Sequence, residues 1–167
     1  MKTQDTDKKR KTGWKSVLFF ALLLGGVYLV NVQVQTYLGQ QALEKLDLEL
    51  LTIEKAMAKS AQTGRPILAE MSAIWCASCR RFDSRVLSDP AVRAMVKERF
   101  VYARVDYDEP GGKRFMQRYG ITGIPHALVL DSEGVVIREL ILSYDPAHFG
   151  AQLERVLGEE STSDEVG

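Results

Sequence analysis

The sequence predicts an α/β fold in which a central mixed β-sheet is flanked by helices and preceded by an N-terminal transmembrane helix. Three observations support this prediction. Apolar, strand-like segments alternate with helical ones from residue 67 onward, a pattern typical of a sheet covered by helices. A charge-free apolar run occupies residues 17–30, behind a basic block. The only two cysteines of the 167-residue chain, Cys76 and Cys79, directly follow one of the apolar strands.

The composition is that of an ordinary globular protein, with 46% hydrophobic and 26% charged residues. Residues 1–15 hold six of the 22 basic side chains and two of the 22 acids, which leaves 16 bases and 20 acids, a net charge of −4, for the rest of the chain. A mildly acidic body argues against nucleic acid as a partner, because phosphate binding requires a basic patch. Two cysteines are also too few for a structural disulfide framework.

The N-terminal residues have the layout of a membrane-targeting sequence. Residues 1–15 form a basic segment that is expected to be disordered as far as Trp14 and to stay in the cytoplasm. The apolar run is short for a membrane span of about 20 residues, and its length also suits a signal-peptide core. A retained transmembrane signal anchor over 16–37 is favoured over a cleaved signal, because no small-x-small cleavage site follows it. Tyr28 and Tyr37 also stand near its far end as interfacial anchors.

This anchor predicts the location of the rest of the chain. By the positive-inside rule everything after Tyr37 is exported. We therefore expect a single-pass protein of the cell inner membrane that contacts the lipid bilayer through residues 16–37 and places its C-terminal domain on the periplasmic side.

Residues 38–64 are predicted to form an amphipathic helix that leads into the domain. Leucine, isoleucine and methionine recur there at spacings of three and four. Packing of this helix on the sheet is favoured over a dimerising coiled coil, because the repeat is short. Gly64 and Pro66 are expected to end it.

A single domain is predicted over residues 65–158. Its expected strands are residues 67–74, 100–106, 127–131 and 135–142, and its expected helices are 80–85, 91–99, 113–119 and a last one that begins at 145. The tail 159–167 is acidic, lacks core residues and is expected to be disordered.

The spacing of Cys76 and Cys79 can place both sulfurs at the start of one helix, close enough to form or break a disulfide. Unpaired N–H groups at a helix N-terminus favour a thiolate, so Cys76 suits the attacking role. Cys79, one turn deeper, would be the resolving thiol. Redox work and metal binding are both open for such a pair, and two inert buried thiols are the structural alternative.

Two stretches of the chain resemble the thioredoxin superfamily, and the likeness covers residues 66 to 157. The first is the strand and motif Ile67-Leu-Ala-Glu-Met-Ser-Ala-Ile-Trp-Cys-Ala-Ser-Cys79. The second is Tyr119-Gly-Ile-Thr-Gly-Ile-Pro125, in which the proline lies 46 residues after Cys79. The segment Ser88-Asp89-Pro90 looks most like the C-terminal domain of membrane thiol:disulfide interchange reductases and related tethered thioredoxins. The resemblance implies a thioredoxin-like fold.

The resemblance also implies roles for single residues around the cysteines. Pro125 would be a cis-proline packed against them, and Ile124 would offer its backbone to a substrate strand. Trp75 would shield Cys76 as an aromatic neighbour.

Glu70, six residues before Cys76, occupies the place of the family's buried acid. Buried there, it would have a raised pKa and accept the proton of Cys79. A solvated carboxylate at a strand edge is the alternative for Glu70.

The chain departs from the family at three places. His126 follows the proline where a small polar residue is usual, and it is expected either to join Ile124 in substrate binding or to be a simple strand residue. Ala77 and Ser78 replace the usual pair between the cysteines. The lysine that many thioredoxins place near the buried acid has no obvious counterpart in residues 100–104.

These observations predict a membrane-tethered thiol:disulfide oxidoreductase that reduces disulfides of exported proteins through the Cys76/Cys79 dithiol. It would need no cofactor beyond this redox-active disulfide, and its partners would be protein thiols and a membrane redox protein that supplies electrons. A disulfide oxidase or isomerase is the alternative within the same chemistry. A copper-handling assembly protein, with Cys76, Cys79 and His126 as ligands, and a non-catalytic interaction module are alternatives of other classes.

Overall fold

The computed structural model describes residues 5–164 and contains one four-stranded sheet in the order β2-β1-β3-β4. The strands are β1 (Ile67–Ser72), β2 (Val101–Asp106), β3 (His126–Leu130) and β4 (Val136–Leu140). β1 and β2 run parallel, whereas the β1–β3 and β3–β4 pairs are antiparallel. The sheet is therefore mixed, as the sequence predicts.

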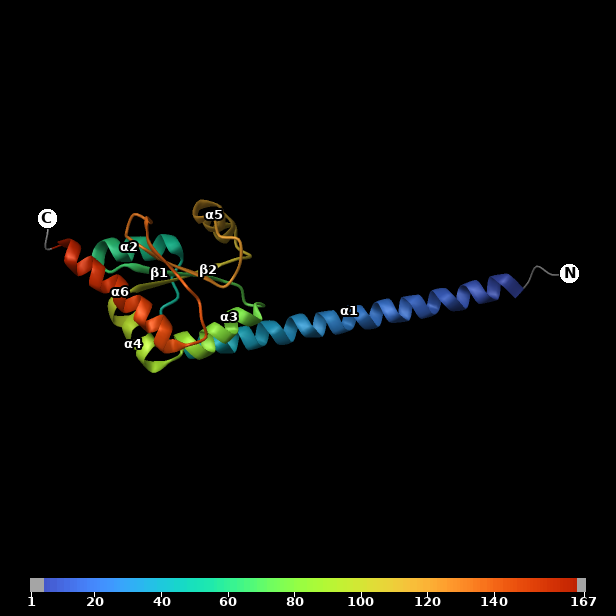
Figure 1. The fold of residues 1–167 in the computed structure, drawn as a ribbon. Coiled ribbons are helices and arrows are strands. Elements are labelled where there is room, and N and C mark those ends of the chain that lie inside the picture. Colours follow the sequence, from blue (N-terminus) through green and yellow to red (C-terminus); the bar gives the residue numbers. More distant parts are fainter. Residues whose placement is uncertain (1–4, 165–167) are drawn as a thin grey trace.

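Helices cover both faces of this sheet (Figure 1). They are α1 (Asp5–Leu46), α2 (Ile53–Thr63), α3 (Ala77–Phe82), the π-helical turn η1 (Asp83–Leu87), α4 (Pro90–Arg99), α5 (Pro110–Tyr119) and α6 (Pro146–Asp164). Side chains of α2 and α5 share one buried cluster with the sheet. Side chains of α3, η1, α4, α6 and the end of α1 share the other.

β1 lies at the centre of the sheet because its residues suit burial on both sides. All six of its residues are buried. Successive side chains of a strand point to opposite faces, and Leu68 accordingly joins the cluster of α4 and α6, while Ile67 and Ala69 join the cluster of α2 and α5. This strand ends at Ser72 and delivers the chain directly to the cysteine pair.

The single helix predicted over 38–64 is wrong. α1 ends at Leu46, Asp47 takes a left-handed conformation with φ 49°, and α2 begins only at Ile53. Leu48 and Leu51 explain the break, since they pack against the two different core clusters, on opposite faces of the sheet. A continuous helix would place these two residues on one face. The free energy gained by burying Leu48 and Leu51 in the two cores outweighs the local preference for a continuous helix.

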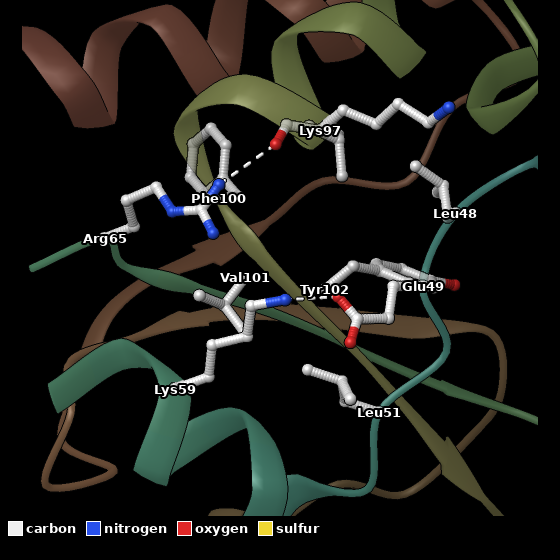
Figure 2. Close-up of a pocket in the computed structure, with 10 residues that line it drawn as sticks. Leu48, Glu49, Leu51, Lys59, Arg65, Lys97, Phe100, Val101 and Tyr102 are labelled. Carbon is white, nitrogen blue, oxygen red and sulfur yellow. Dashed lines mark hydrogen bonds and ion pairs between the residues drawn. The ribbon is translucent and has the colours of Figure 1, made fainter. Parts of the chain in front are cut away.

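The stretch between α1 and α2 adds to the sheet edge and is fastened on both sides. Leu51 forms an isolated parallel bridge with Ala103 of β2. A pocket of about 250 Å³ lies along this stretch, and an ion pair between Lys59 and Glu49 crosses it (Figure 2). On the pocket's other side, Arg65 Nη1 donates a hydrogen bond of 3.0 Å to the carbonyl oxygen of Lys97 (Figure 2). The ion pair of Lys59 with Glu49 holds the stretch to α2, and an ion pair of 2.5 Å between Lys97 Nζ and Asp47 Oδ2 holds it to α4.

The two ends of the chain are more helical than the sequence predicts. Disorder was expected as far as Trp14, but α1 is helical from Asp5. The tail 159–167 is also expected to be disordered, but α6 continues past Gly158 as far as Asp164. Arg138 of β4 forms an ion pair with Glu159 in this part of α6. The remaining parts of these two predictions, residues 1–4 and 165–167, lie outside the described residues.

α1 projects far beyond the sheet and its covering helices (Figure 1). Its part between Trp14 and Gln41 is long and apolar enough to cross a membrane, with a mean hydropathy of 2.1. None of this stretch's most apolar window is buried against the rest of the chain. The predicted anchor at residues 16–37 lies inside this part of α1.

Candidate active site

Cys76 and Cys79 form a disulfide at the start of α3, with their Cα atoms 5.2 Å apart. Cys76 is the N-cap of this helix, and the backbone N–H of Cys79 points at its sulfur over 3.1 Å. The hydroxyl of Ser78 lies 3.2 Å from the same sulfur. Hydrogen-bond donors stabilise a thiolate, so the reduced form is arranged to ionise at Cys76. Cys79 is fully buried, which suits a resolving thiol.

The loop that faces the cysteines carries a cis peptide bond between Ile124 and Pro125, the geometry that the resemblance implies. Ile124 packs against the small cluster that Ala73, Cys76 and Cys79 form. The loop directly precedes β3, whose pairing with β1 fixes its position beside the motif.

Trp75 is half-exposed and held by partners that the sequence did not indicate. Its indole Nε1 donates a hydrogen bond of 2.7 Å to Asp108 Oδ2. Its ring meets Tyr107 edge to face, with the centroids 5.9 Å apart. Both partners follow β2, so the segment before α5 sets the orientation of the aromatic residue beside Cys76.

Glu70 is buried in the middle of β1, and the alternative of a solvated carboxylate is wrong. The hydroxyl of Tyr102 donates to Glu70 Oε2, and Arg104 Nη1 lies 3.2 Å from the same oxygen. Burial raises the pKa of Glu70 to about 7, although Arg104 acts in the opposite direction. Its other oxygen, Oε1, is buried and accepts no hydrogen bond from the described residues. Such a carboxylate can take up a proton near neutral pH.

Arg104 is the missing cation beside the buried acid, which corrects the expectation that residues 100–104 hold no counterpart of the lysine. The register of β1 and β2 places it directly opposite Glu70. Its guanidinium also binds both oxygens of Asp83 in η1, each over 3.1 Å, and donates to Ser72 Oγ over 2.7 Å. Arg104 thereby links two buried carboxylates on different elements.

Burial and charge act against each other within this network. Burial raises the pKa of Asp83, and Arg104 opposes that effect. For Arg104, burial alone would lower the pKa, but the carboxylates of Glu70 and Asp83 raise it above its ordinary value. The signal in the sequence was the alternation of β2, which puts Tyr102 and Arg104 on one face. Only the pairing with β1 reveals that this face carries Glu70.

His126 does not join the two cysteines. Its Nε2 lies 3.4 Å from Glu139 Oε1 of β4. Among the residues that the structure describes, no group of three His, Cys, Asp or Glu side chains is arranged to hold a metal ion. Among these described residues, the structure therefore does not group Cys76, Cys79 and His126 as three ligands.

The buried position of Glu70 makes stability depend on pH. Its folded-state pKa of about 7 exceeds the ordinary value of 4.5, so between these values the folded chain binds more protons than the unfolded one. The free energy of unfolding should then fall as pH rises from 4.5 to 7, by about 3 kcal/mol. Urea unfolding of the full chain in mild detergent across this range measures the slope.

Glu70→Gln is the matched variant for this measurement, since the amide keeps the shape and does not titrate. We expect it to remove most of the slope, leaving the smaller part that Asp83 contributes in the same direction. An unchanged slope in the variant would show that Glu70 is not the titrating group.

A mixed sheet with a buried acid in its central strand, a Cys-x-x-Cys disulfide at a helix N-terminus and a cis-proline loop packed against that disulfide define a thioredoxin-type dithiol domain. A family model described as Thioredoxin-like matches residues 48–132, just over half of the chain. The chain belongs to the thioredoxin-like family.

The chain is similar to individual thiol:disulfide interchange proteins and to a thioredoxin. It is 27% identical over 108 residues to the thiol:disulfide interchange protein DsbD of Ralstonia nicotianae. The matched region covers 64% of this chain and 18% of that protein. The chain spans about a quarter or less of the length of the curated relatives it matches.

Two solved structures show the same fold. A thioredoxin from Thermus thermophilus is 27% identical, with a TM-score of 0.58 over 66% of this chain and 87% of that one. The oxidised DsbD C-terminal domain of Neisseria meningitidis is 24% identical, with a TM-score of 0.53 over 64% of this chain and 98% of that one.

Proposed function

We propose that this protein is a membrane-tethered thiol:disulfide oxidoreductase that reduces disulfides of exported proteins. The single observation that carries the proposal is the Cys76–Cys79 disulfide at the start of α3, directly after the strand that bears Glu70. The names of the relatives as thiol:disulfide interchange proteins support the same activity.

The reaction begins with the reduced dithiol. The Cys76 thiolate attacks one sulfur of the substrate disulfide, which forms a mixed disulfide and releases one substrate thiolate. Cys79 then gives its proton to Glu70 and attacks the Cys76 sulfur, which frees the second substrate thiolate. Two electrons pass to the substrate, which leaves as a dithiol after taking up two protons, and the Cys76–Cys79 disulfide remains.

The recognition of the substrate uses the loop opposite the cysteines. Ile124 packs against the cluster that Ala73, Cys76 and Cys79 form, and we propose that its backbone pairs with an extended substrate segment. His126, one residue beyond the proline, is proposed as a second substrate neighbour.

The anchor sets where this reaction takes place. The apolar part of α1 supports a single span of the inner membrane, with the basic N-terminus in the cytoplasm and the domain on the periplasmic side. The oxidised dithiol must be reduced again, and we assign this step to a second membrane protein that carries a dithiol.

The direction of electron flow is tested by the reduction potential of the full chain in detergent or nanodiscs. An isoleucine before the cis-proline, here Ile124, resembles the arrangement in reducing thioredoxins. We therefore expect a reduction potential of about −270 mV. Equilibration with glutathione or dithiothreitol buffers, followed by alkylation of free thiols, measures it. A potential of about −120 mV would indicate an oxidase and overturn the proposed direction of electron flow. Insulin reduction, assayed in parallel, measures the activity itself.

A further inference from the structure

The C-terminal part of α1 is built into the domain. Leu46 is fully buried in the core cluster that α4 and α6 share, and Leu43 packs against the same cluster. Gly39 is also buried, and Gln35 is half-buried. Residues three or four apart lie on one face of a helix. Gln35, Gly39, Leu43 and Leu46 therefore form an inner face of α1 that contacts the domain.

Gly39 brings the backbone of α1 against Ile74, two residues before Cys76. A Cβ at this position would lie 2.5 Å from both Ile74 Cγ1 and the Ile74 carbonyl oxygen. Only glycine permits this approach, because it has no Cβ. The carbonyl oxygen belongs to the backbone and cannot turn aside as the end of a long side chain could. A larger residue at position 39 would therefore displace either α1 or the segment that contains Ile74.

Arg80 fastens the same place from α3. Its guanidinium donates one hydrogen bond to the side chain of Gln35 and another, of 3.4 Å, to the carbonyl oxygen of Ile74. Arg80 directly follows Cys79 in the chain. The inner face of α1 thus meets the redox motif twice, once on each side of the cysteine pair in the sequence.

Ile74 lies inside the turn that leads from β1 to α3. The backbone N–H of Cys76 closes this turn by donating to the carbonyl oxygen of Ala73 over 3.1 Å. Cys76 then takes an extended conformation as the N-cap of α3, and this conformation points its sulfur at the N–H of Cys79. Ile74 is one of only two residues between the ends of the turn. A shift of Ile74 would therefore move the Cys76 sulfur relative to its donor.

We propose that Gly39 is a positioning residue for the attacking thiol: through Ile74, the inner face of α1 holds the Cys76 sulfur within reach of the N–H of Cys79. This inference rests on the proposed function, which gives Cys76 the attacking role. It assigns to α1 a task besides anchoring, as part of the frame of the active site. Donors at a helix N-terminus favour the thiolate, so a displaced Cys76 should ionise at higher pH.

The test compares Gly39→Ala with Gly26→Ala in the full chain, reduced and held in lipid nanodiscs. Both variants add one methyl group to α1, but a Cβ at Gly26 would meet no atom of the described residues within 4 Å. A Cys79→Ser background leaves Cys76 as the only thiol, and its rate of alkylation by iodoacetamide is measured from pH 5 to 9. We expect Gly39→Ala to move the midpoint of this profile up by about one pH unit, which slows alkylation below the midpoint about tenfold. Gly26→Ala should keep the profile of the unmodified chain.

A second pair of variants tests the contact without crowding it. Gln35→Ala removes the acceptor of Arg80 and adds no atom, whereas Gln33→Ala makes the same change at an exposed position of α1. Gln35→Ala should shift the midpoint in the same direction by less, with alkylation slowed about threefold below it. Gln33→Ala should change nothing.

The outcomes separate this inference from the proposed function. Identical profiles for the two alanine variants of glycine would overturn the positioning role. If Gly39→Ala does not fold, the glutamine pair decides, and identical profiles there would overturn the role as well. Insulin reduction by the unmodified chain is a separate measurement. Its absence would end the proposed function, while the alkylation profiles would still show whether α1 positions Cys76.

Discussion

Arg104→Leu should lower the free energy of unfolding by about 3–5 kcal/mol at pH 8. The variant leaves Glu70 and Asp83 buried without the cation that lies 3.2 Å and 3.1 Å from their oxygens. It also removes the donor to Ser72. Urea unfolding of the full chain in detergent measures the loss. Arg99→Leu is the control, because Arg99 is exposed on α4 and its replacement should cost little.

The charge origin of this loss gives it a pH dependence. Arg104 lowers the pKa of Glu70 and of Asp83, so its removal raises both, and protonation at lower pH neutralises the unpaired charges. The difference between Arg104→Leu and the unmodified chain should therefore shrink as pH falls from 8 to 5. An equal difference at both pH values would mean that Arg104 acts through packing alone.

Cys76→Ser should abolish disulfide reduction, with a loss on the order of a thousandfold or more, because serine supplies no thiolate. Cys79→Ser keeps the attacking sulfur and should instead accumulate the mixed disulfide with substrate. Insulin reduction measures the first effect, and mass spectrometry of the alkylated adduct measures the second.

The two single-cysteine variants serve as controls for each other. The burial of Cys79 and the donors around Cys76 predict that only Cys79→Ser forms the adduct. Adduct formation by Cys76→Ser alone would reverse the assignment of attacking and resolving thiols.

Most of the sheet of this protein can be predicted from its sequence, because local sequence patterns indicate its strands. β1 is predicted as a buried strand because its residues are mostly apolar. Asp89 and Pro90 mark the start of α4 by capping chemistry, and the backbone N–H groups of Ala91 and Val92 donate hydrogen bonds to Asp89. The break between α1 and α2 cannot be predicted from local sequence patterns. The leucines at 48 and 51 fit a helical period, and only the presence of two cores on opposite faces of a sheet separates them.

The candidate site divides along the same line. Residues adjacent to a motif, such as Trp75, Cys76 and Pro125, are found from spacing and from resemblance. Arg104 and Asp83 are not, because they lie 34 and 13 residues from Glu70 in the sequence. Strand register brings Arg104 to Glu70, and Arg104 in turn binds Asp83 of η1. Pairing across strands is a non-local property, so a strand read alone cannot show which charge it faces.

The unbroken path of α1 into the domain has an angular meaning. A helix advances by about 100° per residue, and no hinge between the apolar run and Leu46 absorbs this rotation. In the tethered protein proposed above, one residue added within residues 17–30 would turn the redox centre by about 100° about the helix axis, relative to the N-terminal end of α1. Seven added residues would return it to nearly the same bearing. The number of residues in the anchor therefore sets the angle between the active site and the N-terminal end of α1.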